Sequence, residues 1–328
     1  MHKRTILLSV SLAVLFAGSF VARTLLLNKD KLHGKPCVDT DTAGTSAPSD
    51  ESKPAYTRIV SLAPSITETL FALGLGEQVV GVTRYCDYPH KAKLKNKVGG
   101  YYDPDNEAIV TLHPDLVVLF REHELTQQVL QTAGIEYLMV SHHSIGDILQ
   151  SIETIGKQMG ENSVAFRKAE DLTAELNRRI AAVQEKALAN DPKTVMISTG
   201  RNMGTGKIED VYITGRDGFY HEMIQLAGGE NVYQGHVAFP VVSNEGILRL
   251  NPDVIFDMVP DLGERKLSKQ AILAEWQKLG ALRAVKTQQV HIFTEDYVVV
   301  PGPRFVQLLE KMHQVLHPNY ENSVEDES

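Results

Sequence analysis

The chain alternates between short apolar runs and longer stretches in which apolar residues recur every three or four positions. The short runs predict strands at residues 58–62, 79–82, 116–120, 137–140, 194–198, 254–258 and 290–293. The periodic stretches predict helices at 125–132, 145–159, 218–226, 267–279 and 303–316. A further helix is expected after Pro64, where Ser65-Ile66-Thr67-Glu68 has the spacing of a capping box. Strands that alternate with helices favour an α/β fold with parallel or mixed sheets.

One stretch, residues 163–189, contains neither Gly nor Pro and predicts a single long helix. Its apolar residues recur at three- and four-residue steps: Leu172, Leu176, Ile180, Val183 and Ala187. Because the alternation of strands and helices occurs both before and after it, we expect two Rossmann-like lobes with central sheets, joined by this helix. The expected N-terminal lobe covers 56–160, the bridging helix 161–190 and the C-terminal lobe 191–318.

An internal repeat relates the two expected lobes. The segment at 107–118, Glu-Ala-Ile-Val-Thr-Leu-His-Pro-Asp-Leu-Val-Val, recurs at 245–256 as Glu-Gly-Ile-Leu-Arg-Leu-Asn-Pro-Asp-Val-Ile-Phe. We expect each Glu to begin a short helix and each Pro-Asp to turn the chain into a buried strand. An aromatic residue, Tyr101 or Phe239, stands six positions before each Glu. Packing explains the repeated Ile, Leu and Pro, but it does not require repeated acids, so Glu107 and Glu245 are candidates for a contact role. The alternative is that each carboxylate only stabilises a helix N-terminus.

The two ends of the chain have different compositions from the body. Basic residues 2–4 followed by an apolar or small-residue run over 5–22 predict an export signal within 1–27, either cleaved or retained as a membrane anchor. Cys37 lies too far downstream of this run for a lipoprotein signal. Residues 28–55 are polar and predict a disordered linker, and residues 319–328 form an acidic tail.

Composition and motifs argue against several functions. The net charge of −8 disfavours nucleic-acid binding. Two cysteines cannot build a disulfide framework or hold an enzymatic metal cluster. The Gly-rich segment 199–207 lacks the residue order of a phosphate-binding loop. His142-His143 could ligate a metal, but a surface pair is the favoured interpretation, and Cys86 is interpreted as an inert loop thiol. We therefore expect no catalytic residues, no metal site and no cofactor.

Several motifs resemble the substrate-binding proteins of ABC importers for vitamin B12, iron-siderophores and heme. They are Arg58-Ile-Val-Ser-Leu-Ala-Pro-Ser-Ile-Thr-Glu, Tyr85-Cys-Asp-Tyr-Pro, Val98-Gly-Gly-Tyr, the two Glu-led repeats, Gly228-Gly-Glu-Asn-Val and Pro301-Gly-Pro-Arg. The resemblance implies an exported, monomeric, non-enzymatic protein with a ligand cleft between its lobes. It also implies that Glu107 and Glu245 engage arginines of a permease dimer that works with an ATPase. A membrane-tethered sensor or adaptor, which needs no permease, is the alternative from another class.

The resemblance also suggests ligand-binding residues. Three cleft aromatics of the cobalamin-binding member map onto Tyr85, Tyr101 and Phe239, and flat macrocycles suit aromatic surfaces. Two of these family positions are tryptophan, whereas the one tryptophan of this chain, Trp276, is expected in the core. A corrinoid is the favoured ligand. An iron-siderophore or heme is the alternative, because guanidinium groups bind anionic chelates. The basic candidates are Arg84, Arg201, Lys207, Arg216 and Arg304, of which Arg304 and Arg201 are included among the predicted ligand-binding residues.

Overall fold

The computed structural model describes residues 56–187 and 191–318. The predicted export signal, linker and acidic tail lie outside these residues, as does the junction at 188–190. Within the two described ranges, no helix combines the length and the apolar character needed to cross a membrane.

The N-terminal lobe is built on a five-stranded sheet. Its strands are β1 (Ile59–Ser61), β2 (Val79–Val82), β3 (Asn96–Lys97), β4 (Leu116–Phe120) and β5 (Tyr137–Val140). They lie in the order β3-β2-β1-β4-β5 and all pair in parallel. Its helices are α1 (Pro64–Ala72), the 3-10 helix η2 (His90–Leu94), α2 (Asn106–Thr111), α3 (Glu124–Ala133) and α4 (Ile145–Gln158). The predicted parallel α/β architecture is confirmed, with β3 the strand that the apolar pattern did not predict.

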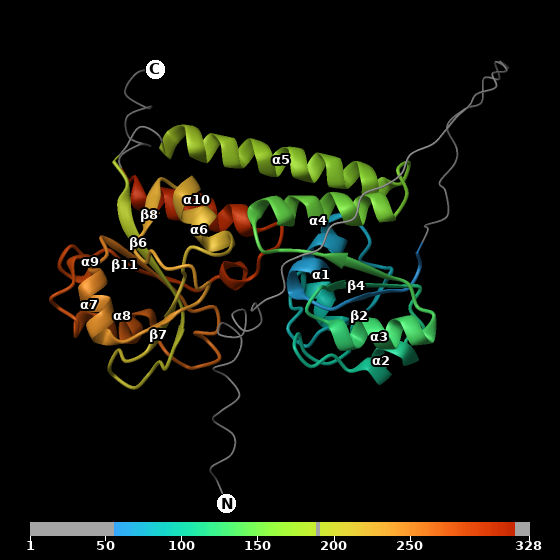
Figure 1. The fold of residues 1–328 in the computed structure, drawn as a ribbon, viewed down its shortest axis with the longest axis horizontal. Coiled ribbons are helices and arrows are strands. Elements are labelled where there is room, and N and C mark those ends of the chain that lie inside the picture. The colour runs from blue at the N-terminus through green and yellow to red at the C-terminus, as the bar shows by residue number, and fades with distance from the viewer. Residues whose placement is uncertain (1–55, 188–190, 319–328) are drawn as a thin grey trace, which may run out of the picture. The chain divides into compact units, whose positions relative to one another are not determined.

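The C-terminal lobe contains a six-stranded mixed sheet. Its strands are β6 (Lys193–Arg201), β7 (Val211–Ile213), β8 (Gly229–Asn231), β9 (Val241–Val242), β10 (Val254–Met258) and β11 (Val290–Phe293). The order is β11-β10-β6-β7-β9, with β8 beside the start of β6, and only the pairings of β7 are antiparallel. Its helices are α6 (Phe219–Leu226), α7 (Asn244–Leu250), α8 (Lys269–Gln277), α9 (Arg283–Lys286), the 3-10 helix η3 (Asp296–Val299) and α10 (Phe305–Leu316). Figure 1 shows both sheets with their helices.

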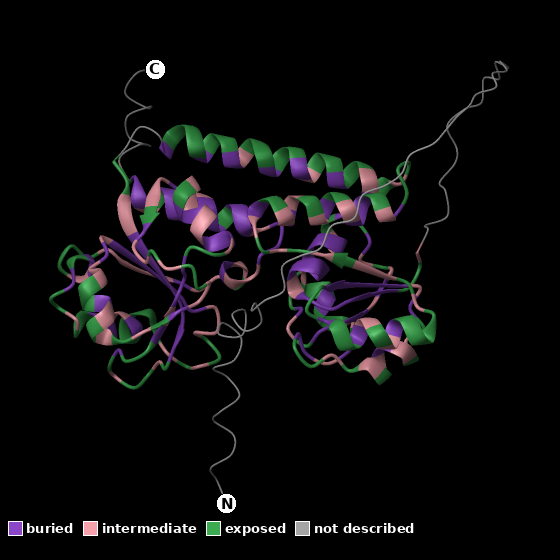
Figure 2. Ribbon diagram, viewed as in Figure 1, coloured by how far each residue is buried: buried purple, intermediate pink, exposed green. Residues whose placement is uncertain are grey.

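The predicted long helix is present as α5 (Val164–Ala187), 24 residues without interruption. It packs against α4 and α10, and its buried residues follow one face: Ala165, Ala169, Thr173, Leu176, Ile180, Val183 and Ala187. Figure 2 shows this face in purple and the opposite face in green. One hydrophobic cluster includes β1 and β4 of the N-terminal lobe, α4 and α5, and α6 and α10 of the C-terminal lobe. The lobes are therefore joined by packed helices as well as by the covalent chain.

The capping-box prediction at the first helix is wrong. α1 begins at Pro64 with Ala63 as its N-cap, and no side chain caps it. Proline fits the first helical position because it has no N–H to satisfy and its φ already suits a helix. The helix therefore starts before Ser65, which places Ser65 and Glu68 inside it, where both are buried.

Candidate functional site

The two repeated glutamates occupy equivalent positions on the two lobes. Glu107 and Glu245 are each the second residue of a short helix, α2 or α7, and both are exposed. The caps are other residues: Asp105 accepts a hydrogen bond from the amide of Ala108 at 2.9 Å, and Ser243 accepts one from the amide of Gly246 at 3.3 Å. Because Asp105 and Ser243 supply the side-chain caps, the hydrogen bonds of a helix cap do not account for the repeated acids.

The surroundings of the two glutamates differ. Glu107 lines a groove of about 380 Å³ together with Lys97, Asp105 and Thr111. Within four positions of Glu245 in the chain, Val241 and Leu248 are exposed apolar residues. The repeat has therefore kept the acid at both places while the neighbouring side chains have changed.

Tyr101 lies in the hydrophobic core of the N-terminal lobe with 5% of its surface exposed. Its hydroxyl donates a hydrogen bond to the Glu122 carboxylate, and its carbonyl oxygen lies 2.8 Å from Nε2 of His123. Burial, together with the nearby negative charge of Glu122, raises the pKa of Tyr101 far above its usual value. The side chain is therefore a neutral phenol whose proton is held by a carboxylate.

Tyr85 and Phe239 are half-buried aromatic residues that pack against the same hydrophobic cluster to which Tyr101 belongs. The Arg84 guanidinium lies 5.6 Å from the centroid of the Tyr85 ring and pairs with Asp103 at 2.7 Å. Phe239 meets Tyr220 edge to face, with ring centroids 6.3 Å apart. Of the three predicted aromatic residues, Tyr101 is therefore buried in this cluster, whereas Tyr85 and Phe239 are partly exposed against it.

Arg304 is held by two carboxylates and two aromatic rings. It donates to both Glu68 oxygens, at 3.0 and 2.6 Å, and to both Asp296 oxygens, at 2.8 and 3.0 Å. Its guanidinium carbon lies 3.6 Å from the centroid of the Tyr88 ring and 5.4 Å from that of Tyr297. Burial lowers the pKa of Arg304, but the hydrogen bonds that it donates to its two carboxylate partners outweigh this and raise the pKa. Arg304 is charged, and its donors are directed at protein groups.

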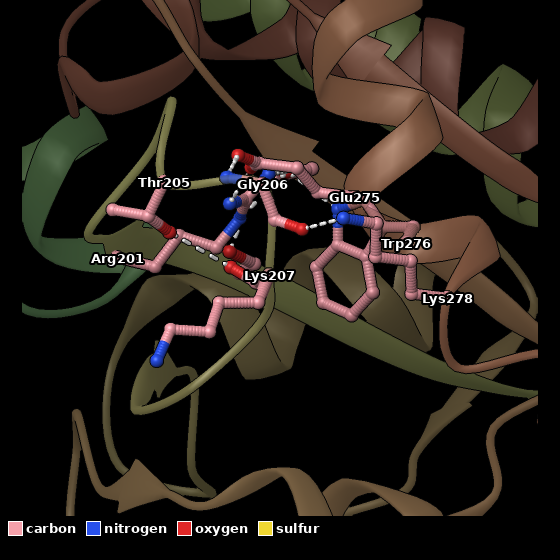
Figure 3. A network of polar contacts seen from close by, with 9 residues as sticks. Arg201, Thr205, Gly206, Lys207, Glu275, Trp276 and Lys278 are labelled. Carbon is pink, nitrogen blue, oxygen red and sulfur yellow. Dashed lines mark hydrogen bonds and ion pairs between the residues drawn. The ribbon is translucent and has the colours of Figure 1, made fainter.

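Arg201 lies inside the C-terminal lobe, at the end of β6, with 1% of its side chain exposed. It pairs with Asp257 at 3.2 Å and with Glu275 at 2.5 Å. Asp257 also accepts hydrogen bonds from the hydroxyl of Ser198 and the indole N–H of Trp276, both at 2.7 Å. Figure 3 shows the arginine with Glu275 and Trp276. The expectation that Arg201 contacts a ligand therefore has no support in this arrangement, because its guanidinium is enclosed and paired. Trp276 is in the core, as expected.

The same cluster anchors the Gly-rich segment that follows β6. Glu275 accepts a hydrogen bond from the Gly206 amide at 2.8 Å, and the Lys278 ammonium donates to the Gly206 carbonyl (Figure 3). Lys207 is exposed and pairs with Glu209 at 2.5 Å. The backbone of Gly206 therefore ties this loop to the end of α8.

The two adjacent histidines have different environments. His143 is exposed and pairs with Asp217 of the C-terminal lobe at 2.8 Å. His142 packs edge to face on Phe120, with centroids 4.0 Å apart, and burial lowers the pKa of His142 to about 4. The surface-pair interpretation is thus right for His143 and wrong for His142, whose ring is largely covered.

Cys86 is buried and makes contacts at 3.1 Å with the hydroxyls of Thr67 and Thr83. Burial raises the pKa of the Cys86 thiol, which agrees with an inert side chain. Among the residues that the structure describes, no group of three or more His, Cys, Asp or Glu side chains could hold a metal ion.

Sequence reasoning missed the partners of the two arginines. Glu68, Asp257 and Glu275 are each 5% exposed or less, and none was singled out as a partner of an arginine. The spacing of Ser65 and Glu68 in the sequence predicts a helix cap rather than an ion pair. No local sequence pattern signals these pairs, because each of these acids lies 56 or more residues from its arginine.

Comparisons with known proteins agree with this architecture. The sequence model of the family described as "Periplasmic binding protein" matches residues 59–297. An uncharacterised ABC transporter substrate-binding lipoprotein, YvrC of Bacillus subtilis (strain 168), is 31% identical over 271 residues, which cover 80% of each chain. A vitamin B12-binding protein of Photorhabdus laumondii is 28% identical and covers 80% of this chain and 88% of its own length.

A solved structure shares the fold over a similar extent. The periplasmic heme-binding protein RhuT from Roseiflexus sp. RS-1, in its apo form, superimposes with a TM-score of 0.68 and 26% identity. It covers 80% of this chain and 98% of its own. The chain belongs to the periplasmic binding protein family.

Proposed function

We propose that this chain, a substrate-binding protein of an ABC importer, captures a flat metal chelate and delivers it to a membrane permease. The favoured ligand is a corrinoid. The observation that carries the proposal is the pair of aromatic residues at equivalent places in the repeat, Tyr101 and Phe239, each six positions before an exposed glutamate. Phe239 and Tyr85 are half-buried and supply aromatic surface, which holds a planar macrocycle with little loss of side-chain entropy, whereas Tyr101 is buried and donates to Glu122.

The arrangement of the arginines favours a corrinoid over an anionic chelate. Three of the four candidate arginines, Arg84, Arg201 and Arg304, are each engaged by at least one carboxylate of the protein, whereas Arg216 is exposed. A siderophore or heme carries carboxylate or catecholate oxygens that would need uncommitted positive charge. Heme remains the second candidate, because the heme-binding RhuT structure shares the fold over four-fifths of this chain.

The exposed acids support a permease partner. Glu107 and Glu245 project from equivalent helices of two lobes, and the lobes are joined by a packed helix. Two acids on lobes so joined suit a symmetric pair of cationic sites, as a permease dimer would offer. We further propose that the protein acts as a monomer outside the cytoplasm, after export directed by residues 1–27, which are either cleaved or retained as an anchor.

A thermal-shift panel tests the ligand. The full chain is heated with cyanocobalamin, hemin and several ferric siderophores, each at a series of concentrations. A ligand present at about 100 times its Kd should stabilise the protein by roughly 2.7 kcal/mol. The proposal expects the largest shift with the corrinoid. A larger shift with hemin would move the assignment to the second candidate, and no shift with any chelate would contradict it and favour a sensor or adaptor.

A further inference from the structure

The loop from Thr83 to Pro89 carries two aromatic side chains at the surface of the N-terminal lobe. Tyr85 is half-buried, and Tyr88 is 45% exposed. Within the loop, the Cys86 amide donates to the Thr83 carbonyl at 3.1 Å. Arg304 of the C-terminal lobe lies over the Tyr88 ring, with its guanidinium carbon 3.6 Å from the ring centroid.

Arg304 approaches from the C-terminal lobe, directly before α10. Its side chain is 12% exposed and its partner on α1, Glu68, is 4% exposed, so this pair is shielded from solvent. The second partner, Asp296 on η3, is 57% exposed. A bidentate pair between planar groups fixes orientation as well as distance. The arginine thus joins α1 and the aromatic loop of one lobe to η3 of the other.

The backbone before Arg304 is also pressed against α1. A β-carbon added at Gly302 would lie 3.2 Å from Cα of Ser65 and 3.2 Å from a carboxylate oxygen of Glu68. That is closer than ordinary van der Waals contact, so a side chain here would require its neighbours to shift. The absence of a side chain at Gly302 allows the loop to bring Arg304 within reach of Glu68.

We propose that Arg304 is a positioning residue that fixes the aromatic loop 83–89 relative to the C-terminal lobe, with Tyr88 stacked on its guanidinium. In this role it contacts no ligand. It holds the loop that presents Tyr85, so loss of Arg304 should loosen this loop more than it loosens the two sheets. Only the consequence for ligand capture rests on the function proposed above.

Hydrogen–deuterium exchange on the ligand-free full chain tests the positioning role. The variant Arg304→Lys keeps the charge but loses the fork that spans two carboxylates and the planar face for stacking. Peptides covering 83–92 should exchange about tenfold faster in this variant, because a local opening has become easier. Peptides from β4 and β10 should be unchanged. Arg178→Lys is the matched control, since it alters an exposed pair with Glu175 on α5.

Tyr88 provides a second and milder test that avoids the buried pair. Tyr88→Phe keeps the ring over the guanidinium and should leave exchange of 83–92 as in the parent protein. Tyr88→Leu removes the ring and should accelerate exchange there. Unchanged exchange in both Arg304→Lys and Tyr88→Leu overturns the proposal, and so does an equal acceleration in 83–92, β4 and β10. If Arg304→Lys does not fold, Tyr88→Leu and Asp296→Asn decide the question.

A ligand measurement then separates this inference from the proposed function. Cyanocobalamin affinity should fall about fivefold or more in Tyr88→Leu and stay unchanged in Tyr88→Phe, in proportion to the lost order of the loop. Altered exchange without binding of any chelate by the parent protein would refute the proposed function and leave the positioning role standing. Binding of a chelate by the parent protein without altered exchange in either variant would refute the positioning role and leave the proposed function standing.

Discussion

Asp115 and Asp253 hold the central strands of the two lobes in the same way. One oxygen of Asp115 accepts hydrogen bonds from the amide and the hydroxyl of Thr57, both at 2.8 Å. One oxygen of Asp253 accepts the same two bonds from Thr194, at 2.9 and 2.7 Å. Both aspartates come from the Pro-Asp of the repeat, so this motif fastens β1 to β4 and β6 to β10 where the strands begin.

Replacing either aspartate with asparagine should lower stability by about 1–2 kcal/mol at pH 7, because hydrogen bonds to a charged acceptor are weakened. Partial burial raises the pKa of Asp115, but hydrogen bonds from Thr57 and Arg58 outweigh it and lower the pKa below its usual value. At Asp253, hydrogen bonds from Thr194 and Arg283 likewise outweigh partial burial and lower the pKa. This stabilisation is therefore present above the unfolded pKa of about 4 and is lost as the pH falls through the lowered folded value.

Urea unfolding at several pH values checks this expectation. The difference between the parent protein and Asp115→Asn or Asp253→Asn should narrow as the pH is lowered from 5 to about 3. Asp171→Asn, at an exposed position of α5, is the charge-matched control and should change stability little at any pH. A stability difference that stays constant with pH would show that the charge of the carboxylate does not strengthen its hydrogen bonds with the threonine.

Arg201→Met should destabilise the protein by about 3–5 kcal/mol, because it leaves Asp257 and Glu275 buried without their counter-charge. Ligand affinity of the folded fraction should be unchanged. The measurements are urea unfolding and the binding of whichever chelate the thermal-shift panel identifies. Lys207→Met, in the exposed loop that follows β6, is the control. A variant with parental stability but weaker ligand binding would restore Arg201 to the ligand site.

Glu107→Ala and Glu245→Ala should each abolish or strongly reduce uptake while ligand affinity stays within about twofold of the parent value, since exposed acids at an interface act mainly on association with the partner. The assay is chelate uptake in cells that produce the permease and its ATPase, paired with binding to the purified variants. Glu161→Ala and Glu264→Ala remove exposed acids elsewhere on the chain. Loss of ligand affinity in the first pair would contradict a docking role, and so would equal loss of uptake in the second pair.

His142 should make the folded state sensitive to acid. Burial lowers the pKa of His142 to about 4, against about 6.5 in the unfolded chain, so the unfolded chain binds more protons between these values. The free energy of unfolding is therefore unaffected by His142 above pH 6.5 and falls as the pH is lowered toward 4. The total loss is about 3 kcal/mol.

The variant His142→Phe keeps an aromatic ring beside Phe120 and removes the titration. Its stability should depend less steeply on pH between 6.5 and 4 than that of the parent protein, in urea unfolding at half-unit steps. His236→Gln, which replaces an exposed histidine, should leave the parental slope intact. Identical slopes in the parent and His142→Phe would show that His142 protonates without cost to the fold.

Phe239→Ala and Tyr85→Ala should each weaken chelate binding by about tenfold, the usual cost of removing an aromatic contact at a binding surface. Isothermal titration with cyanocobalamin measures the change. Tyr137→Ala removes a half-buried aromatic residue from β5 and serves to separate loss of affinity from loss of stability. If all three variants weaken binding alike, the aromatic positions carry no ligand contact of their own.

Regular elements with a strong local pattern could be predicted from the sequence. The runs at β2, β4, β5, β10 and β11 are mostly apolar, and the observed strands have the predicted bounds. The absence of Gly and Pro set the extent of α5. The strands β3, β7, β8 and β9 were missed because each has only two or three residues, too few to show a period, and their pairing depends on neighbouring strands.

The sequence by itself determined two α/β lobes, the helix between them and the repeated acids, because spacing along the chain encodes each of these features. Only the tertiary structure decided what the arginines do. Arg201 meets Asp257 across 56 residues and Arg304 meets Glu68 across 236, and no local pattern reports such pairs. A guanidinium in a loop looks the same in sequence whether it faces solvent, a ligand or a buried carboxylate. What distinguishes these cases is the side chain that the fold places beside it.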